Sequence, residues 1–399
     1  MYNYDCIYNL IHYKPSSDEP LITSITEFCI DTNTPSLKGS QLLTLRKENK
    51  DLILTCMAGI TSSNGEPLVY LSDTRKKEFI SFNKTAASFT LTALPLDKSS
   101  STAPFIDLAI IYKTFGSKSF AALFALEPNS LSLVIQDQTA NTKLWEGKIE
   151  LPKELLEVEA LAVEATSLGL LGKDEKGDAK VIGWDFERLF LENQKTTDLT
   201  LRMALGTLSK EDITEFVKKI SKEFFSFTIP LAHEEKATSL AMIKKVLFVT
   251  TSSKDKEAKL HLTPLPNKKK ATTHTILLPY SQGKEAIKIV GNNAFSFIAL
   301  QDPATRQGEI LICKNEDLKE ESPPIKRISL SEYPYSLTLT KNALYIAVIA
   351  EGKNEKSFGL KMAHLIEVAK EPVPGLIPIS SNIPVSHITP FAIGLPIKL

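Results

Sequence analysis

Residues 239–250 read SLAMIKKVLFVT, and residues 336–347 read SLTLTKNALYIA. Each stretch contains a short run with alternating apolar side chains, a polar turn of two or three residues and a second apolar run. Residues 287–298, IKIVGNNAFSFI, follow the same order between them. Aligned on their second apolar runs, successive stretches are 48 and 49 residues apart. Paired short strands that recur at one period indicate a chain built from a repeated all-β unit.

The same pattern recurs nearer the N-terminus, at residues 42–54 and 161–171, with a weaker copy around residues 105–112. A charged loop then leads to a third strand-like run, seen at residues 68–71, 181–184, 260–262 and 309–312. A fourth, more polar run completes the unit, seen at residues 78–82, 199–202, 274–278 and 325–330. Six units of four strands between about residues 40 and 380 predict a β-propeller.

The spacing of its repeats makes the chain resemble the broad group of β-propellers. Within that group, the most specific resemblance is to the WD40 type. Trp184 and Asp185 form the dipeptide that WD40 blades place at the end of the third strand, and it occurs once. The resemblance implies one all-β domain over residues 1–399, with no narrower family indicated.

Strand-like residues near both ends of the chain belong to none of the six units. They lie at residues 6–11, 21–25 and 388–397. Propellers commonly close the ring by pairing strands from both ends in one composite blade, which removes an open sheet edge. We therefore expect about seven blades, with residues 1–35 and 380–399 in the closing blade. Six or eight blades are the alternatives.

One segment, residues 208–225, departs from the strand pattern. Its apolar residues have the i, i+3, i+4, i+7 spacing of one helical face, namely Ile213, Phe216, Val217 and Ile220. Ser209 is suited to cap the first turn, where Glu211 and Asp212 favour the positive end of the helix dipole. We expect a helix inserted between two blades, its apolar face packed either on the propeller or on a partner.

The charge of the chain argues against partners recognised by bulk electrostatics. Lys and Arg together number 47, and Asp and Glu together also number 47, so the formal net charge is zero. Six of the basic residues are arginines. Nucleic-acid binders usually carry a basic excess, and arginine suits phosphates and guanine better than lysine does. Nucleic acid is therefore not predicted as a partner. The strongest local basic run is Lys268, Lys269 and Lys270, in a loop between two strands.

No catalytic residue, cofactor or metal site is predicted. The histidines lack ligand spacing, and His261 and His274 are expected to be cross-strand neighbours on a sheet surface. No Gly-rich phosphate loop and no G-x-S-x-G motif occurs. No C-x-x-C pair occurs among the four cysteines, which are Cys6, Cys29, Cys56 and Cys313. Buried free thiols in a reducing compartment explain such cysteines.

The sequence also predicts an intracellular, cytoplasmic protein without a membrane span. Its N-terminus lacks a basic segment followed by an apolar core. The longest uncharged stretch, residues 373–397, contains five prolines that would break a membrane helix.

These features favour a non-catalytic interaction module or scaffold that binds protein partners through a propeller face and its loops. The candidate interaction residues are Phe216, Lys219 and Ile220 of the helix and Lys268, Lys269 and Lys270 of the basic loop. One alternative is a lactonase-like hydrolase with its active site at the mouth of the central channel. Another is a structural component of a larger assembly. Three or more ionisable side chains converging in the channel would favour the hydrolase.

Overall fold

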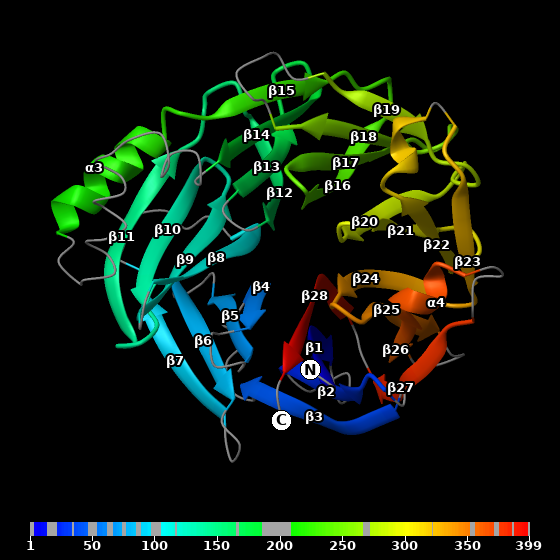
Figure 1. Ribbon diagram of the computed structural model, residues 1–399, viewed down its shortest axis with the longest axis horizontal. Coiled ribbons are helices and arrows are strands. Elements are labelled where there is room, and N and C mark those ends of the chain that lie inside the picture. The colour runs from blue at the N-terminus through cyan, green and yellow to red at the C-terminus, as the bar shows by residue number, and fades with distance from the viewer. Residues whose placement is uncertain are drawn as a thin grey trace.

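Seven four-stranded antiparallel sheets follow one another around a ring in the computed structural model (Figure 1). The predicted all-β propeller is confirmed, and the described residues form seven blades. The structure describes residues 4–13, 22–33, 36–46, 54–61, 67–73, 77–84, 89–96, 105–115, 118–164, 167–185, 209–265, 272–320, 322–351, 356–370, 375–384 and 387–397.

Three blades make up the first half of the ring, each with its strands in chain order from the ring opening outward (Figure 1). Blade 1 comprises β4 (Leu54–Thr61), β5 (Pro67–Asp73), β6 (Glu78–Lys84) and β7 (Phe89–Pro95). Blade 2 comprises β8 (Asp107–Phe115), β9 (Lys118–Glu127), β10 (Ser130–Asp137) and β11 (Thr142–Glu150). Blade 3 comprises β12 (Glu157–Glu164), β13 (Ser167–Lys173), β14 (Ala179–Asp185) and β15 (Phe225–Ile229).

Three further blades repeat this arrangement. Blade 4 comprises β16 (Lys236–Ile243), β17 (Val246–Ser252), β18 (Lys259–Pro264) and β19 (His274–Leu277). Blade 5 comprises β20 (Glu285–Gly291), β21 (Phe295–Asp302), β22 (Gln307–Lys314) and β23 (Ile325–Leu330), with the 3-10 helix η1 (Asp317–Lys319) before β23. Blade 6 comprises β24 (Tyr333–Leu339), β25 (Ala343–Glu351), β26 (Lys356–His364) and β27 (Ile377–Pro384), with the short helix α4 (Leu365–Val368) before β27.

The closing blade joins the two ends of the chain. It contains β28 (His387–Ile397), β1 (Tyr4–Tyr13), β2 (Ile22–Asp31) and β3 (Ser36–Arg46). β28 lies beside the ring opening and pairs antiparallel with β1 (Figure 1). The first strand of every blade, β28 in this one, contacts the first strands of both neighbouring blades. The ring therefore has no open end.

A buried carboxylate fastens the closing blade to blade 6. Asp5 Oδ2 on β1 accepts hydrogen bonds from the Thr340 hydroxyl at 2.6 Å and from the Tyr345 hydroxyl at 2.9 Å. Asp5 is fully buried, and this burial raises the pKa of its carboxyl group. The two donors offset part of the desolvation cost of the carboxylate.

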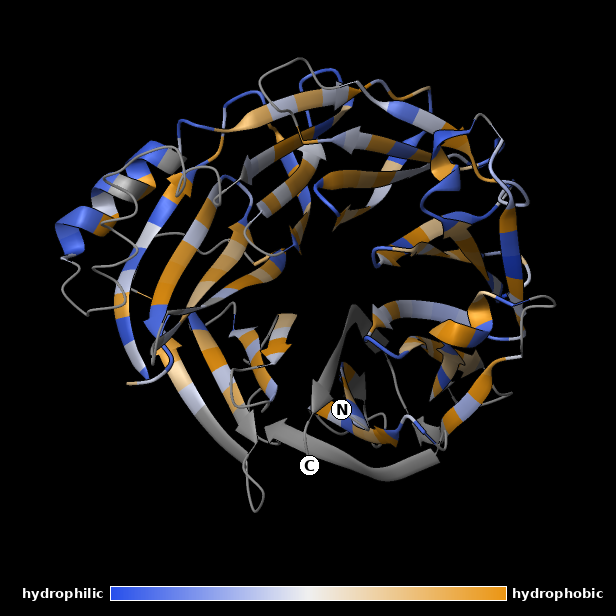
Figure 2. Cartoon of the chain, in the orientation of Figure 1, coloured by the Kyte–Doolittle hydropathy of each residue, from blue (hydrophilic) through white to orange (hydrophobic). Residues whose placement is uncertain are grey.

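The core lies between blades, and each middle strand therefore buries both of its faces. On β17, Leu247 and Val249 pack toward blade 3, whereas Phe248 packs toward blade 5. This explains the near-continuous apolar sequences of β17, β21 and β25, which Figure 2 shows as orange strand interiors. Burying each large apolar side chain contributes roughly 1.5–3 kcal/mol.

The first repeat unit begins one strand later in the chain than the sequence predicted. Residues 42–45 belong to β3, the outer strand of the closing blade, and β4 begins blade 1 at Leu54. Residues 68–71 and 78–82 consequently lie in the second and third strands, β5 and β6, rather than the third and fourth. The closing blade also extends to Arg46, beyond the expected residue 35. The error arose because β3 shares the alternating pattern of a first strand.

The helix α3 (Lys210–Ile220) lies within blade 3, between its third and fourth strands, and not between two blades as expected. Its N-cap is Ser209, whose side chain accepts from the Asp212 amide in a capping box. The fourth strand of blade 3 is β15, in which Phe225 pairs with Gly183. A Cβ atom on Gly183 would lie 1.8 Å from the Phe225 ring, so this pairing requires glycine. The expected fourth strand at residues 199–202 lies outside the described residues.

The apolar face of α3 packs on the propeller itself. Ile213 and Val217 are buried in the cluster that includes Trp145 and Ile149 of β11. The Trp145 indole N–H donates to the Thr214 hydroxyl at 3.1 Å. Among the described residues, no helix has the length and apolar character needed to cross a bilayer.

Candidate functional site

A groove of about 860 Å³ lies between blades 4 and 5 at one end of their strands. It is bounded by the β16–β17 turn, the end of β18, the start of β19, the β20–β21 turn and the segment after β22. Its lining includes Ile243, Lys244, Val246, Phe248, Leu262, Thr272, His274, Asn293, Lys314, Asn315, Glu316, Leu318 and Lys319. The name "groove" below refers to this set.

The floor of the groove is apolar. Phe248 and Leu262 come from blade 4, and Leu318 comes from η1, between β22 and β23 of blade 5. All three side chains are buried in the cluster between the two blades. Half-buried Val246 and exposed Pro264, which line the groove beside them, offer the apolar surface that a partner side chain would remove from water.

The rim of the groove is positively charged. Lys314 pairs with Glu316, so these two charges offset one another. Lys244 and Lys319 are exposed, and neither forms an ion pair with a described acidic residue. Three lysines and one glutamate line the groove, so the lining itself has an excess of positive charge in a chain whose net charge is zero.

The β16–β17 turn is held by the neighbouring blade. Lys244 and Lys245 both have positive φ, 50° and 59°, as a two-residue hairpin turn requires. This conformation costs roughly 1–2 kcal/mol for each non-glycine residue. The Glu164 carboxylate on β12 accepts from the amides of Lys244 at 2.7 Å and Lys245 at 2.9 Å. The turn that carries Lys244 is therefore fixed before any ligand arrives.

The opposite wall of the groove is fixed in the same way. Asn292 Oδ1 accepts from the amides of Ala294 at 2.8 Å and Phe295 at 2.9 Å. The Asn315 side-chain amide donates to the Asn292 carbonyl at 2.7 Å, and the Ser296 hydroxyl donates to Asn315 Oδ1 at 2.6 Å. Both walls are thus preorganised, which reduces the entropy lost on binding.

His274 supplies an unsatisfied polar atom at the groove. Its Nε2 is buried and has no hydrogen-bond partner among the described residues. A buried nitrogen without a partner costs roughly 1–3 kcal/mol. Sequence reasoning found His274 but gave it no role.

The expected pairing of His261 with His274 is wrong. His261 pairs with Thr275, and His274 pairs with Leu262, so the two rings lie on opposite faces of blade 4. The His261 ring nitrogens contact the Thr251 hydroxyl at 3.1 Å and the Thr275 hydroxyl at 3.0 Å. Burial lowers the pKa of His261 to about 4. The side chain is therefore a neutral member of a buried network.

The structure separates the residues that sequence analysis proposed for interaction. Lys219 is half-exposed and lies 3.9 Å from Glu223 in an ion pair on α3. Phe216 and Ile220 lie on α3, but their side chains are outside the described part of the structure. Lys268, Lys269 and Lys270 are not among the described residues either. They belong to the segment that joins β18 to β19, and Thr272 at its end lines the groove.

The ring opening contains one strongly perturbed carboxyl group on β8. Asp107 accepts from the amides of Leu108 and Leu161 through its two carboxylate oxygens, each at 2.7 Å. Burial raises the pKa of Asp107 to about 6, while the charge of Lys288 acts in the opposite direction. Lys288 lies on β20, across the opening from β8 (Figure 1). The bond to Leu161 ties blade 2 to blade 3, so Asp107 has a structural explanation.

No protein-family model and no curated protein matches the chain. Solved structures resemble it over nearly its full length. A candidate 6-phosphogluconolactonase from Bacteroides fragilis has TM-score 0.52 and 12% identity, covering 98% of this chain and 97% of its own. The S511A mutant of puromycin hydrolase has TM-score 0.53 and 9% identity, covering 96% of this chain and 53% of its own, so this chain spans about half of that protein. The WD40 domain of SCAP from fission yeast has TM-score 0.48 and 10% identity, covering 95% of this chain and 88% of its own. At such identities the likeness shows a shared β-propeller fold and leaves the activity open.

Proposed function

We propose that this propeller is a non-catalytic interaction module that binds an extended, acidic segment of a partner protein in the groove. The observation that carries the proposal is the combination of the apolar floor with two exposed lysines, Lys244 and Lys319, that form no ion pair with described acidic residues. A ligand complementary to this surface has an apolar side chain flanked by carboxylates.

Each part of the groove has a defined task in this proposal. The floor formed by Phe248, Leu262 and Leu318 receives the apolar side chain of the ligand. Lys244 and Lys319 attract the flanking carboxylates and set the orientation of the segment.

The hydrolase alternative receives less support from the same structure. Each oxygen of Asp107 accepts from a backbone amide, and the bond to Leu161 joins two blades, so the carboxylate already has a structural task. The charge of Lys288 acts on Asp107, so among the described residues two ionisable side chains come near one another there. The assembly alternative predicts contacts over a larger surface than one groove, and the experiment below distinguishes it.

The experiment compares the full chain with a charge-reversed groove variant, Lys244→Glu/Lys319→Glu. Each protein is immobilised and exposed to a library of extended peptides and to cell lysate, with bound species identified by mass spectrometry. We expect the wild type to select peptides with Asp or Glu around one apolar residue, and the variant to bind them at least about tenfold more weakly.

The matched control is Lys153→Glu/Lys176→Glu, which reverses two exposed lysines far along the chain from the groove. This control should bind as the wild type does. Equal peptide binding by the groove variant and the wild type refutes the groove as the binding site. Recovery of a stoichiometric complex that both variants retain would instead support the assembly alternative.

A further inference from the structure

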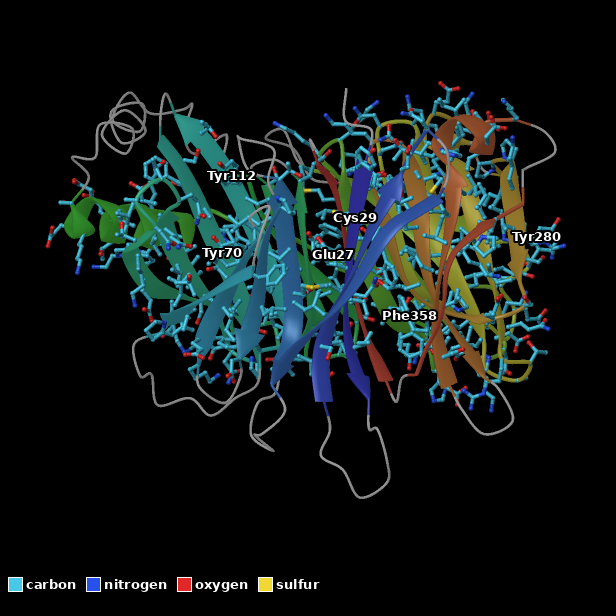
Figure 3. All side chains as sticks on the ribbon, turned by 90° about the horizontal axis from the view of Figure 1, so that it is seen from below. Glu27, Cys29, Tyr70, Tyr112, Tyr280 and Phe358 are labelled. Atoms are coloured by element: carbon cyan, nitrogen blue, oxygen red, sulfur yellow. The ribbon has the colours of Figure 1, made fainter. Side chains whose placement is uncertain are left out.

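Four chemically active side chains meet on one face of the closing blade. Cys6 and Tyr8 lie on β1, directly opposite Cys29 and Glu27 of β2. Because side chains two residues apart on a strand share a face, the four form a compact square. Figure 3 labels Glu27 and Cys29 within the strands of this blade. Sequence reasoning missed the group because 22 intervening residues separate Cys6 from Cys29.

The distances within this group are short. The two sulfur atoms of Cys6 and Cys29 are 2.9 Å apart. The ligand atoms of Cys6, Glu27 and Cys29 all lie within 4.8 Å of one another. The Tyr8 hydroxyl donates to Glu27 Oε1 at 2.7 Å. Two thiols and one carboxylate thus converge on a common point.

The surroundings of the group are apolar. Cys6 and Glu27 are buried, and the cluster around Cys6 and Tyr8 includes Met57, Val69 and Phe82. Cys29 is half-buried, so the group is reachable from one side.

We propose that Cys6, Glu27 and Cys29 form a binding site for a thiol-seeking divalent metal ion of the zinc type. Two thiolates and a carboxylate are ligands that Zn²⁺ takes, and a fourth position stays open on the Cys29 side. When the ion binds, each cysteine releases its thiol proton to solvent and its sulfur forms a bond to the metal. The metal ion brings two positive charges and the two thiol protons take two away, so the net charge of the buried group does not change.

The geometry requires a small adjustment. Tetrahedral zinc with bonds of about 2.3 Å to sulfur holds two thiolates about 3.8 Å apart. The sulfur atoms must therefore separate by less than about 1 Å, which a rotation of the half-buried Cys29 side chain supplies. Tyr8 keeps the Glu27 carboxylate oriented while this happens, as outer hydrogen bonds do for metal ligands generally.

The test titrates the reduced, metal-free full chain with Zn²⁺ against a competing chelator, and with Co²⁺ followed by visible absorption. We expect one ion per chain, a sulfur-to-cobalt charge-transfer band and a higher midpoint of thermal unfolding in Zn²⁺. Cys29→Ser and Glu27→Gln should each weaken binding at least about tenfold, and Tyr8→Phe should weaken it roughly 10- to 100-fold without removing a ligand. Circular dichroism checks that each variant is folded.

Cys313→Ser is the control, since Cys313 is a buried thiol in blade 5, outside the proposed site. It should bind the metal as the wild type does. Absence of one-to-one binding by the wild type, or unchanged binding by Cys29→Ser, overturns the proposal. A third outcome also overturns the proposal: the reduced protein binds no metal, and in air both thiols are lost with a mass decrease of two hydrogens. That result would show that the two cysteines form a disulfide.

Discussion

Replacing His261 with glutamine should remove one cause of the loss of folding stability at acid pH. The ring is buried, both nitrogens contact threonine hydroxyls, and burial lowers the pKa of His261 to about 4. In the unfolded chain the pKa is about 6.5. Between these values the unfolded state binds the proton and the folded state does not. The folded state therefore loses stability as the pH falls through this window.

The size of the effect follows from the two pKa values. A shift of about 2.5 units corresponds to roughly 3 kcal/mol, most of which is lost by about pH 4. Asp107 acts in the opposite direction because burial raises its pKa to about 6, above the ordinary value of 3.8. As the pH falls below about 6, the folded state takes up a proton on Asp107 and gains roughly 3 kcal/mol. The two effects oppose one another in the wild type.

The assay measures the free energy of unfolding in urea at several pH values between 7.5 and 4, for the wild type and His261→Gln. The fluorescence of Trp145 and Trp184 reports unfolding, since both indoles are buried. We expect the stability difference between the two proteins to shift by about 3 kcal/mol in favour of the variant as the pH falls. In the same background, Asp107→Asn should remove the roughly 3 kcal/mol of stabilisation that protonation of Asp107 supplies on acidification. A pH-independent difference between wild type and variant refutes the reasoning.

Two further predictions concern packing and ring closure. Ile213→Ala should lower the free energy of unfolding by roughly 2–4 kcal/mol because Ile213 is buried against the propeller, whereas Glu215→Ala on the exposed face of α3 should change it by less than about 0.5 kcal/mol. Equal effects in urea unfolding would mean that α3 does not pack as described. Tyr345→Phe keeps the ring but removes one donor from buried Asp5, and should cost roughly 1–3 kcal/mol. Thermal and urea unfolding measure this loss, and an unchanged midpoint would show that the bond between blade 6 and the closing blade is energetically neutral.

The spacing of the repeat units could be found from the sequence because the blades bury both faces of their middle strands. β17, β21 and β25 are therefore apolar enough to stand out at regular intervals. The start of blade 1 could not be assigned, because β3 alternates in the same way as a first strand and belongs to the closing blade. The predicted position of α3 was wrong because the segment between β14 and β15 is longer than the usual connection between the third and fourth strands of a blade.

The candidate sites were less accessible to sequence reasoning than the fold. The groove combines residues from two blades and η1, and no local motif links Lys244 to Lys319. One signal was present, since two consecutive lysines between apolar runs mark an exposed two-residue turn. Cys6 and Cys29 meet because β1 and β2 pair in one particular register. A shift of one residue would place Cys29 on the other face of the sheet.

The position of β28 has a consequence for synthesis on the ribosome. β1 needs β28 as its inner neighbour, yet about 370 residues must be translated after β1 before β28 emerges. Until then β1 presents an unpaired edge, a surface that recruits other strands and promotes aggregation. Blades 1 to 6 contain all their own strands and need only one another to bury their faces, whereas the closing blade needs both ends of the sequence. A nascent chain of this protein is therefore an open arc, and chaperones have the longest access to its first strand.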